Sequence, residues 1–263
     1  MDFTIFVCHY KPLKERREFL DNQFKKHKFE VEYVTEYDRE ELTKDDLVLF
    51  DTKSKLKLSE ISIAMKHIEC YRRIVQRKLQ FALIFEDDVI LDTEFCDKVV
   101  SYLEQVKQKN WNMLYIGSGW NLHVPSSVTK QGGNVFLKSN RCPTQAEKEE
   151  GWQICGGSTR CFDSYFITHQ TANVILEHFD TVIINKKEGR RLRSHIHIHT
   201  PIDHHMNSVI NRYNFKVYWA EPSIVKQGSE RGQTNLPETL DGSAIFPSFL
   251  KSANDFVKNM NFT

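Results

Sequence analysis

The chain has 263 residues, of which 40% are hydrophobic, enough apolar material for one sizeable core. Its 36 Lys and Arg residues nearly balance 35 Asp and Glu residues. A general nucleic-acid-binding protein has an excess of positive charge, so this class of function is excluded. No apolar run is long enough to span a membrane, and the amino terminus has no basic start typical of a signal peptide. The expected location is therefore the cytoplasm.

The first half of the chain alternates strand and helix patterns. Strands are expected at residues 4–8, 31–35, 81–85 and 113–116. Helices are expected at residues 13–24, at 59–75 with Ser59 as the N-cap, and from about Glu94 to 106. This order predicts an α/β fold with a doubly wound, mostly parallel sheet, helices on both faces and ligands at the carboxyl ends of the strands.

The pattern breaks down between about residues 120 and 160. This polar stretch is long for a loop and is predicted to be a substrate-shaping insertion or a disordered segment. Order resumes with a strand at 162–168, helices at 170–179 and 202–213, and a strand at 215–219.

The six cysteines are scattered and form no Cys-x-x-Cys pair. They are Cys8, Cys70, Cys96, Cys142, Cys155 and Cys161. The simplest interpretation is free thiols in a reducing compartment, and the alternative is a disulfide among the last three.

Three adjacent acids, Glu86, Asp87 and Asp88, stand where the most hydrophobic strand ends. Their charges repel one another, and a divalent cation such as Mg²⁺ or Mn²⁺ would compensate them. Side chains alternate along an extended backbone, so Glu86 and Asp88 are the expected metal pair, and Asp87 points the other way. The alternative is a set of acids at a helix N-terminus, and the cluster alone also fits phosphohydrolases and phosphoacceptor domains.

The surroundings of the acids resemble the signature of family 25 glycosyltransferases, which include lipooligosaccharide and collagen hydroxylysine galactosyltransferases. That signature is a Gly-Glu-Ile-Gly…Ser-His helix leading into a Leu-Glu-Asp-Asp-Val strand end. In this chain, Ser59 and Ser62 replace the glycines, Lys66 replaces the serine before His67, and the strand ends Phe-Glu-Asp-Asp-Val. Further blocks that match in family order are 9–13 with Arg16-Arg17, 111–117, 162–167, 201–203 and 227–229.

The resemblance implies a GT-A-type fold in a single domain over 1–263. Its parts would be a nucleotide-sugar-binding half at about 1–120, an acceptor half at about 120–230 and a C-terminal extension at 231–263. It also implies an inverting, metal-dependent transfer of a galactose- or glucose-type hexose. The donor would be a UDP-sugar, and the acceptor a hydroxyl of a glycan, glycolipid or glycosylated protein, as in lipopolysaccharide biosynthesis. Glu86 and Asp88 would hold Mn²⁺ or Mg²⁺ against the donor diphosphate.

An inverting transfer needs a general base, and Asp203 in the first turn of the predicted helix 202–213 is the candidate. The alternative is that Asp203 only caps this helix. Gln227 stands where many GT-A enzymes place a third metal ligand. The predicted contacts to the nucleotide-sugar are Cys8, His9, Tyr10, Asp38, His67, Asp87, Gly156 and Gly157. The competing interpretation of Asp38 is a solvated acid, that of His67 is a structural histidine, and that of the two glycines is a hinge.

His195, His197 and His199 alternate along the chain, and His204 and His205 follow. A zinc site is one interpretation, and a solvated or acceptor-facing histidine patch is the preferred one.

Two other classes of function compete with the transferase. A metal-dependent phosphoester hydrolase would use the same carboxylates but needs no acceptor half, so the well-patterned segment at 160–220 counts against it. A catalytically inactive nucleotide-sugar-binding module would accommodate the substitutions beside His67, but the intact acids and Asp203 count against it.

Overall fold

The computed structural model describes residues 3–51, 53–117, 119, 123–124, 126–138, 160–188 and 197–228. Its strands are β1 (Thr4–Cys8), β2 (Glu32–Val34), β3 (Phe81–Glu86), β4 (Val89–Leu91), β5 (Met113–Tyr115), β6 (Val135–Leu137), β7 (Ser164–Thr168), β8 (Val217–Ala220) and β9 (Val225–Gln227). Its helices are α1 (Lys14–His27), η1 (Asp46–Leu49), α2 (Leu58–Gln76), α3 (Phe95–Lys107), α4 (Ser126–Thr129), α6 (His169–Lys187) and α7 (Ile202–Tyr213).

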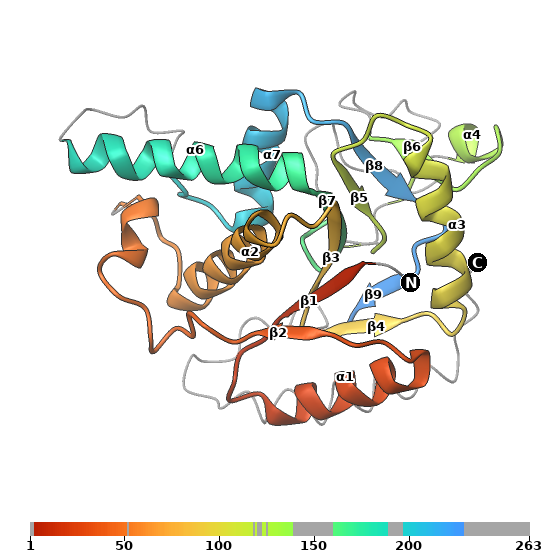
Figure 1. The fold of residues 1–263 in the computed structure, drawn as a ribbon, viewed down its shortest axis with the longest axis horizontal. Helices are drawn as coiled ribbons and strands as arrows, with labels where there is room; N and C mark the ends of the chain where they lie inside the picture. Colours follow the sequence, from red (N-terminus) through yellow and green to blue (C-terminus); the bar gives the residue numbers. More distant parts are fainter. Residues whose placement is uncertain are drawn as a thin grey trace.

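A seven-stranded sheet of order β2-β1-β3-β7-β5-β8-β6 runs through the centre of the molecule (Figure 1). The strands β2, β1 and β3 are parallel, and β5 and β8 are parallel to each other. Strand β7 lies between β3 and β5 and runs antiparallel to both, and β6 runs antiparallel to β8 at the edge. Five of the seven strands therefore share one direction, and the predicted mostly parallel α/β sheet is confirmed.

Helices cover both faces of the sheet, as predicted (Figure 1). On one face, Phe6 and Ile84 pack with buried residues of α2, α6 and α7. On the other face, Val7 and Phe85 pack with buried residues of α1 and α3. Successive strand residues face opposite cores because side chains alternate along an extended strand. Burial on both faces explains why β1 and β3 read as continuous apolar runs.

Several boundaries differ from the sequence prediction. Ser59 is not the N-cap of α2, because the helix begins at Leu58 and the Glu60 carboxylate accepts a hydrogen bond from the Lys57 backbone N–H at 2.7 Å. The strands β4, β6 and β9 were not predicted. Strand β6 lies inside the stretch predicted to be irregular and extends the sheet beside β8. Each of the three has only three residues, too few for a hydrophobic period.

Of the described cysteines, Cys8, Cys70 and Cys96 are free thiols. Cys142 and Cys155 lie outside the described residues. In the part of the chain that the structure describes, no helix combines the length and apolar character that crossing a lipid bilayer requires.

The histidines near α7 form a partly buried group instead of a solvated patch. His205 is only 2% exposed, and its ring lies 6.3 Å from that of His178 and 6.4 Å from that of His199, between ring centroids. Among the described residues, neither ring nitrogen of His205 has a hydrogen-bond partner. His204 is largely exposed, and His195 lies outside the described residues. The preferred sequence interpretation is therefore wrong for His205.

We expect His205 to make the protein acid-sensitive. Burial, with smaller contributions from His178 and His199, lowers the pKa of His205 to about 4 from its usual 6.5. Between these two values the unfolded chain binds a proton that the folded chain does not, so the free energy of unfolding falls as the pH drops from about 6.5 to about 4. The full loss is about 3 kcal/mol. Urea denaturation at pH 7.0 and pH 4.5 measures it.

The control for this prediction is His205→Phe, which has no titratable ring and suits a site already stacked against Phe179. This variant is expected to lose less stability on acidification than the parent protein, whereas the exposed-site variant His204→Phe behaves like the parent. An equal pH dependence for all three proteins contradicts the prediction.

Candidate active site

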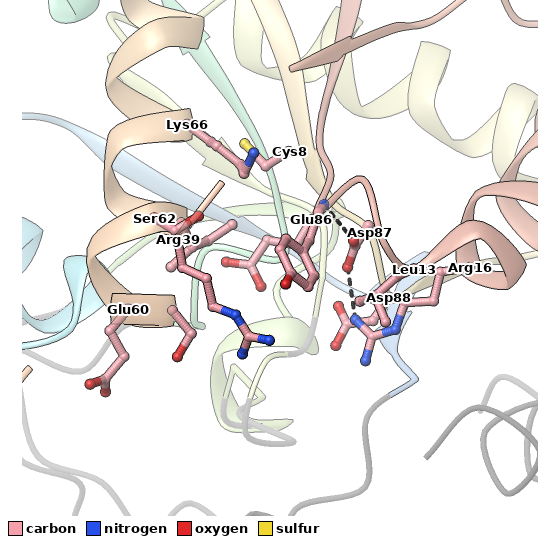
Figure 2. A pocket seen from close by; sticks show the side chains of 13 residues that line it. Cys8, Leu13, Arg16, Arg39, Glu60, Ser62, Lys66, Glu86, Asp87 and Asp88 are labelled. Carbon is pink, nitrogen blue, oxygen red and sulfur yellow. Dashed lines mark hydrogen bonds and ion pairs between the residues drawn. The ribbon is translucent and has the colours of Figure 1, made fainter. Parts of the chain in front are cut away.

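A cavity of about 460 Å³ opens at the carboxyl ends of β1 and β3 (Figure 2). This is the edge at which ligands bind in open α/β sheets. The cavity is lined by Cys8, Tyr10, Leu13, Arg16, Arg39, Ser59, Glu60, Ser62, Ile63, Lys66, Glu86, Asp87 and Asp88. The three adjacent acids thus face the same space as the start of α1 and the first turns of α2.

Asp87 is held by the segment that follows β1. Its carboxylate lies 2.9 Å from His9 Nδ1 and accepts hydrogen bonds from the Tyr10 backbone N–H at 3.1 Å and from Arg16 at 2.7 Å. Although burial raises the pKa of Asp87, the hydrogen bonds and positive charges of His9 and Arg16 more than offset it, and the pKa is lowered. Asp87 is therefore an ionised group that fixes β3 to the first loop.

Glu86 and Asp88 have different neighbours from Asp87. Glu86 Oε1 lies 3.3 Å from His67 Nε2, and Asp88 Oδ2 lies 3.4 Å from Gln227 Nε2. Strand β3 ends at Glu86, and a turn holds Asp87 and Asp88. The prediction attributed the different direction of Asp87 to the alternation of side chains along a strand. This reason is wrong beyond Glu86, where the strand ends. The turn, and the partners of each carboxylate, separate Asp87 from the other two.

Burial raises the pKa of Glu86 well above its usual range, and the carboxylates of Asp88, Asp203 and Asp87 raise it further. The charge of Arg16, which is paired with Asp87, lowers the pKa of Glu86 and only partly offsets these effects. Burial and the neighbouring carboxylates therefore disfavour the ionised form of Glu86 at this end of the cavity.

Asp163 is a fourth acid of this cluster that sequence reasoning missed. It is completely buried just before β7, and its carbonyl oxygen accepts a 2.9 Å hydrogen bond from the Glu86 N–H. Within the described residues, Asp163 Oδ1 has no hydrogen-bond partner. Burial, followed by the charges of Glu86 and Asp88, raises the pKa of Asp163 well above its usual range. The only signal in the sequence is a single acid between aromatic residues.

The cluster fits a hard divalent cation on these grounds. An orphaned carboxylate oxygen and a raised pKa both mark carboxylates that lack positive charge. In the described part of the chain, no set of three or more His, Cys, Asp or Glu side chains forms a ready-made metal site. Mg²⁺ commonly binds through one or two carboxylates and takes its other ligands from substrate phosphates and water. Glu86 and Asp88, which line the cavity, fit that pattern.

Gly117, directly after β5, makes room for Asp163. A Cβ atom at this position would overlap Asp163 Oδ2 and Ser164 Oγ. We expect Gly117→Ala to displace Asp163 and to lower the free energy of unfolding by about 1–3 kcal/mol, the usual cost of overpacking. Chemical denaturation measures this change. The double variant Gly117→Ala/Ser164→Ala should recover part of the loss, compared with Ser164→Ala alone. A Gly117→Ala protein as stable as the parent contradicts the expectation.

The predicted nucleotide contacts divide into two groups. Cys8, Tyr10 and Asp87 line the cavity, whereas His9, Asp38 and His67 do not. Asp38 is buried with its carboxylate 2.6 Å from Lys66 Nζ. Gly156 and Gly157 lie outside the described residues.

His67 is completely buried, which favours the competing interpretation as a structural histidine. Its Nδ1 lies 2.9 Å from the hydroxyl of Tyr165, and its Nε2 faces Glu86. The contact of its Nε2 with the Glu86 carboxylate makes His67 a residue that orients Glu86.

Asp203 lies in the first turn of α7, and its charge contributes to the raised pKa of Glu86. The structure therefore brings Asp203 close to the acid cluster from a distant part of the sequence. The segment before α7 is fixed to the end of η1 by hydrogen bonds between Ile198 and the backbone of Leu49 and Asp51, each 3.0 Å long. This anchor sets the position of the first turn, where the Asp203 side chain is 15% exposed.

Gln227 is the last residue of β9 and pairs with Val89 of β4. Its position at the end of a two-stranded sheet brings its side chain to Asp88, on the turn that precedes β4.

The chain is similar to known glycosyltransferases. The model of glycosyltransferase family 25 (LPS biosynthesis protein) matches residues 3–206. Procollagen galactosyltransferase 2 of mouse is 25% identical over 126 residues, which cover 43% of this chain and 20% of that protein. The human protein is 24% identical over the same length, with the same shares. The match thus spans about a fifth of the length of these relatives.

Among solved structures, a glycosyltransferase involved in the glycosylation of the major capsid of PBCV-1 aligns with a TM-score of 0.42 and 9% identity. The alignment covers 86% of this chain and 93% of that one. The strand order and the helices on both faces are themselves consistent with a Rossmann-like GT-A arrangement. The family match runs from β1 to Met206 in α7, and so includes the acid cluster and Asp203. The chain belongs to glycosyltransferase family 25.

Proposed function

We propose that this glycosyltransferase is inverting and metal-dependent and moves a galactose- or glucose-type hexose from a UDP-sugar to a hydroxyl. The acceptor would be a glycan, a glycolipid or a glycosylated protein. The observation that supports this proposal best is the cavity of about 460 Å³ that Glu86 and Asp88 line, where the charge of Asp203 also raises the pKa of Glu86.

Glu86 and Asp88 would hold Mn²⁺ or Mg²⁺, with Gln227 as a further oxygen ligand beside Asp88. When bound, such an ion neutralises charge on the departing nucleoside diphosphate. His67 keeps Glu86 in place, and His9 and Arg16 keep Asp87 in place, so the turn at the end of β3 presents its carboxylates in one arrangement. Arg16 and Arg39 line the same cavity and supply positive charge near the diphosphate.

Asp203 would act as the general base. In an inverting transfer the acceptor oxygen bonds to the anomeric carbon while the bond from that carbon to the phosphate oxygen breaks. The hydroxyl proton passes to the Asp203 carboxylate. The partial exposure of Asp203 and its proximity to Glu86 support this role, because the base must reach both the acceptor and the donor.

The division into a nucleotide-sugar half, an acceptor half and a C-terminal extension remains part of the proposal. So does the cytoplasmic location, which the free thiols of Cys8, Cys70 and Cys96 support.

The test is incubation of the purified chain with a panel of nucleotide-sugars, Mn²⁺ or EDTA, and sugar acceptors, with nucleotide release as the readout. We expect release from UDP-hexoses that requires Mn²⁺ or Mg²⁺ and increases with an acceptor. Absence of metal-dependent release from every donor overturns the proposal. Cleavage of simple phosphoesters without an acceptor would indicate a hydrolase instead.

A further inference from the structure

Lys66 is a buried lysine in the wall of the cavity. It is only 2% exposed, and it stands where the family 25 pattern has a serine. Its Nζ donates hydrogen bonds to the backbone oxygen of Glu36 at 2.7 Å and to Asp38 Oδ1 at 2.6 Å. An ammonium group has three N–H donors, so these two contacts leave capacity for one more acceptor. Figure 2 labels Lys66 and Cys8 among the side chains that line the cavity.

The loop after β2 is clamped to α2 by two side chains one helical turn apart. Ser62 Oγ donates to the carbonyl oxygen of Tyr37 at 2.6 Å, and Lys66 binds the residues on either side of Tyr37. Tyr37 has a φ of 66°, a left-handed conformation that this clamp holds in place. Lys66 therefore cannot leave its position without releasing the loop.

Charge divides the cavity into two ends. At one end lie Glu86 and Asp88, the two acids proposed to hold a cation and, with it, a diphosphate. At the other end, Asp38 balances the charge of Lys66 in a 2.6 Å buried ion pair. The Lys66 ammonium is already paired with Asp38, so a second full negative charge on a ligand would have no matching positive charge here. A neutral carbonyl oxygen can instead accept a hydrogen bond from the remaining N–H of Lys66. The neighbouring Ile63, Leu13 and Tyr10 offer apolar and aromatic surface to a flat ring.

We propose that Lys66 determines base specificity by donating a hydrogen bond to the O4 carbonyl of a uracil ring. This inference rests on the proposed use of a UDP-sugar and names the residue that distinguishes this nucleotide. Cytosine carries an amino group at the same ring position. Two donors would then face each other, and the Lys66 N–H would stay unpaired on binding. Lys66, and not Asp38, is thus the residue of this loop–helix contact that meets the nucleotide.

The test compares the binding of UDP and CDP to the full chain with Mn²⁺ by calorimetry. We expect the parent protein to prefer UDP by about 10- to 100-fold, the range of one hydrogen bond to a charged group. Lys66→Met should bring the ratio of the two dissociation constants close to one. Lys66→Met leaves the buried Asp38 carboxylate without its partner. If that variant folds poorly, the measurement is repeated with the double variant Lys66→Met/Asp38→Asn, which removes the carboxylate charge as well. Lys26→Met, at an exposed lysine of α1 that does not line the cavity, is the control and should leave the ratio unchanged.

The outcomes separate this inference from the proposed function. If no nucleoside diphosphate binds to the parent protein, the proposed function fails. If UDP and CDP bind the parent equally well, or if the double variant weakens both by the same factor, then Lys66 only holds the loop and the inference fails.

Discussion

Replacing Asp88 by alanine is expected to lower metal-dependent nucleotide release from the donor by about 10³-fold. Asp88 lines the cavity beside Glu86, and its carboxylate is one of the causes that raise the pKa of Glu86. If these carboxylates hold the ion that stabilises the leaving diphosphate, removal of one costs about 4 kcal/mol in the transition state. Initial rates at saturating donor, across a titration of Mn²⁺, measure the effect.

Asp21→Ala is the matched control for Asp88→Ala. Asp21 is an aspartate of α1 that pairs with Arg17 and Tyr33 on the outer surface and does not line the cavity. Its loss should leave the rate and the Mn²⁺ dependence as in the parent. Calorimetric titration of Mn²⁺ into Asp88→Ala supplies a second readout, since weaker binding of the ion is expected there as well. Parent-like metal binding and rate in Asp88→Ala would remove this cluster from the mechanism.

Replacing Asp203 by asparagine is expected to lower kcat by about 10²- to 10⁴-fold, the usual contribution of a general base. Asparagine keeps the shape and the polarity of the side chain but cannot accept the proton. Because Asp203 would act on the acceptor, KM for the donor should change little. This split between kcat and KM distinguishes a base from a residue that only supports the fold.

His204→Gln provides the comparison for Asp203→Asn. His204 lies 4.0 Å from the Asp203 carboxylate and is largely exposed, so its loss should change kcat much less. If Asp203→Asn retains the parent kcat, or if it raises KM for the donor while kcat is unchanged, Asp203 is not the base.

Much of the fold could be predicted because its central elements carry strong local signals. The predicted helix 202–213 matches α7 residue for residue, since Pro201 fixes its start and Asn214 ends it in a left-handed conformation. The strands β4 and β9 could not be predicted, because their pairing joins residues far apart in the chain and neither is long enough to show a period.

Part of the candidate site could be predicted from the sequence for the same reason. Glu86, Asp87 and Asp88 are adjacent in the sequence, so their repulsion could be deduced without a structure. The roles of Asp163 and Lys66 depend on neighbours that only folding supplies. Lys66 reads as an ordinary polar residue of an amphipathic helix until Glu36 and Asp38 are seen to receive its ammonium group. Asp163 reads as an isolated acid until β7 pairs with β3.

The reversed direction of β7 has a consequence for how this enzyme family can vary. In a wholly parallel sheet, only segments that follow strands reach the ligand-binding edge. Because β7 runs against β3 and β5, its first residues lie at that edge, together with Asp163 just before them. Substitutions just upstream of β7 can therefore alter the chemistry at the acid cluster while every parallel strand keeps its register. A deep mutational scan should accordingly find Asp163 more sensitive for activity than the equally buried Phe162, whose loss affects the hydrophobic core and hence folding.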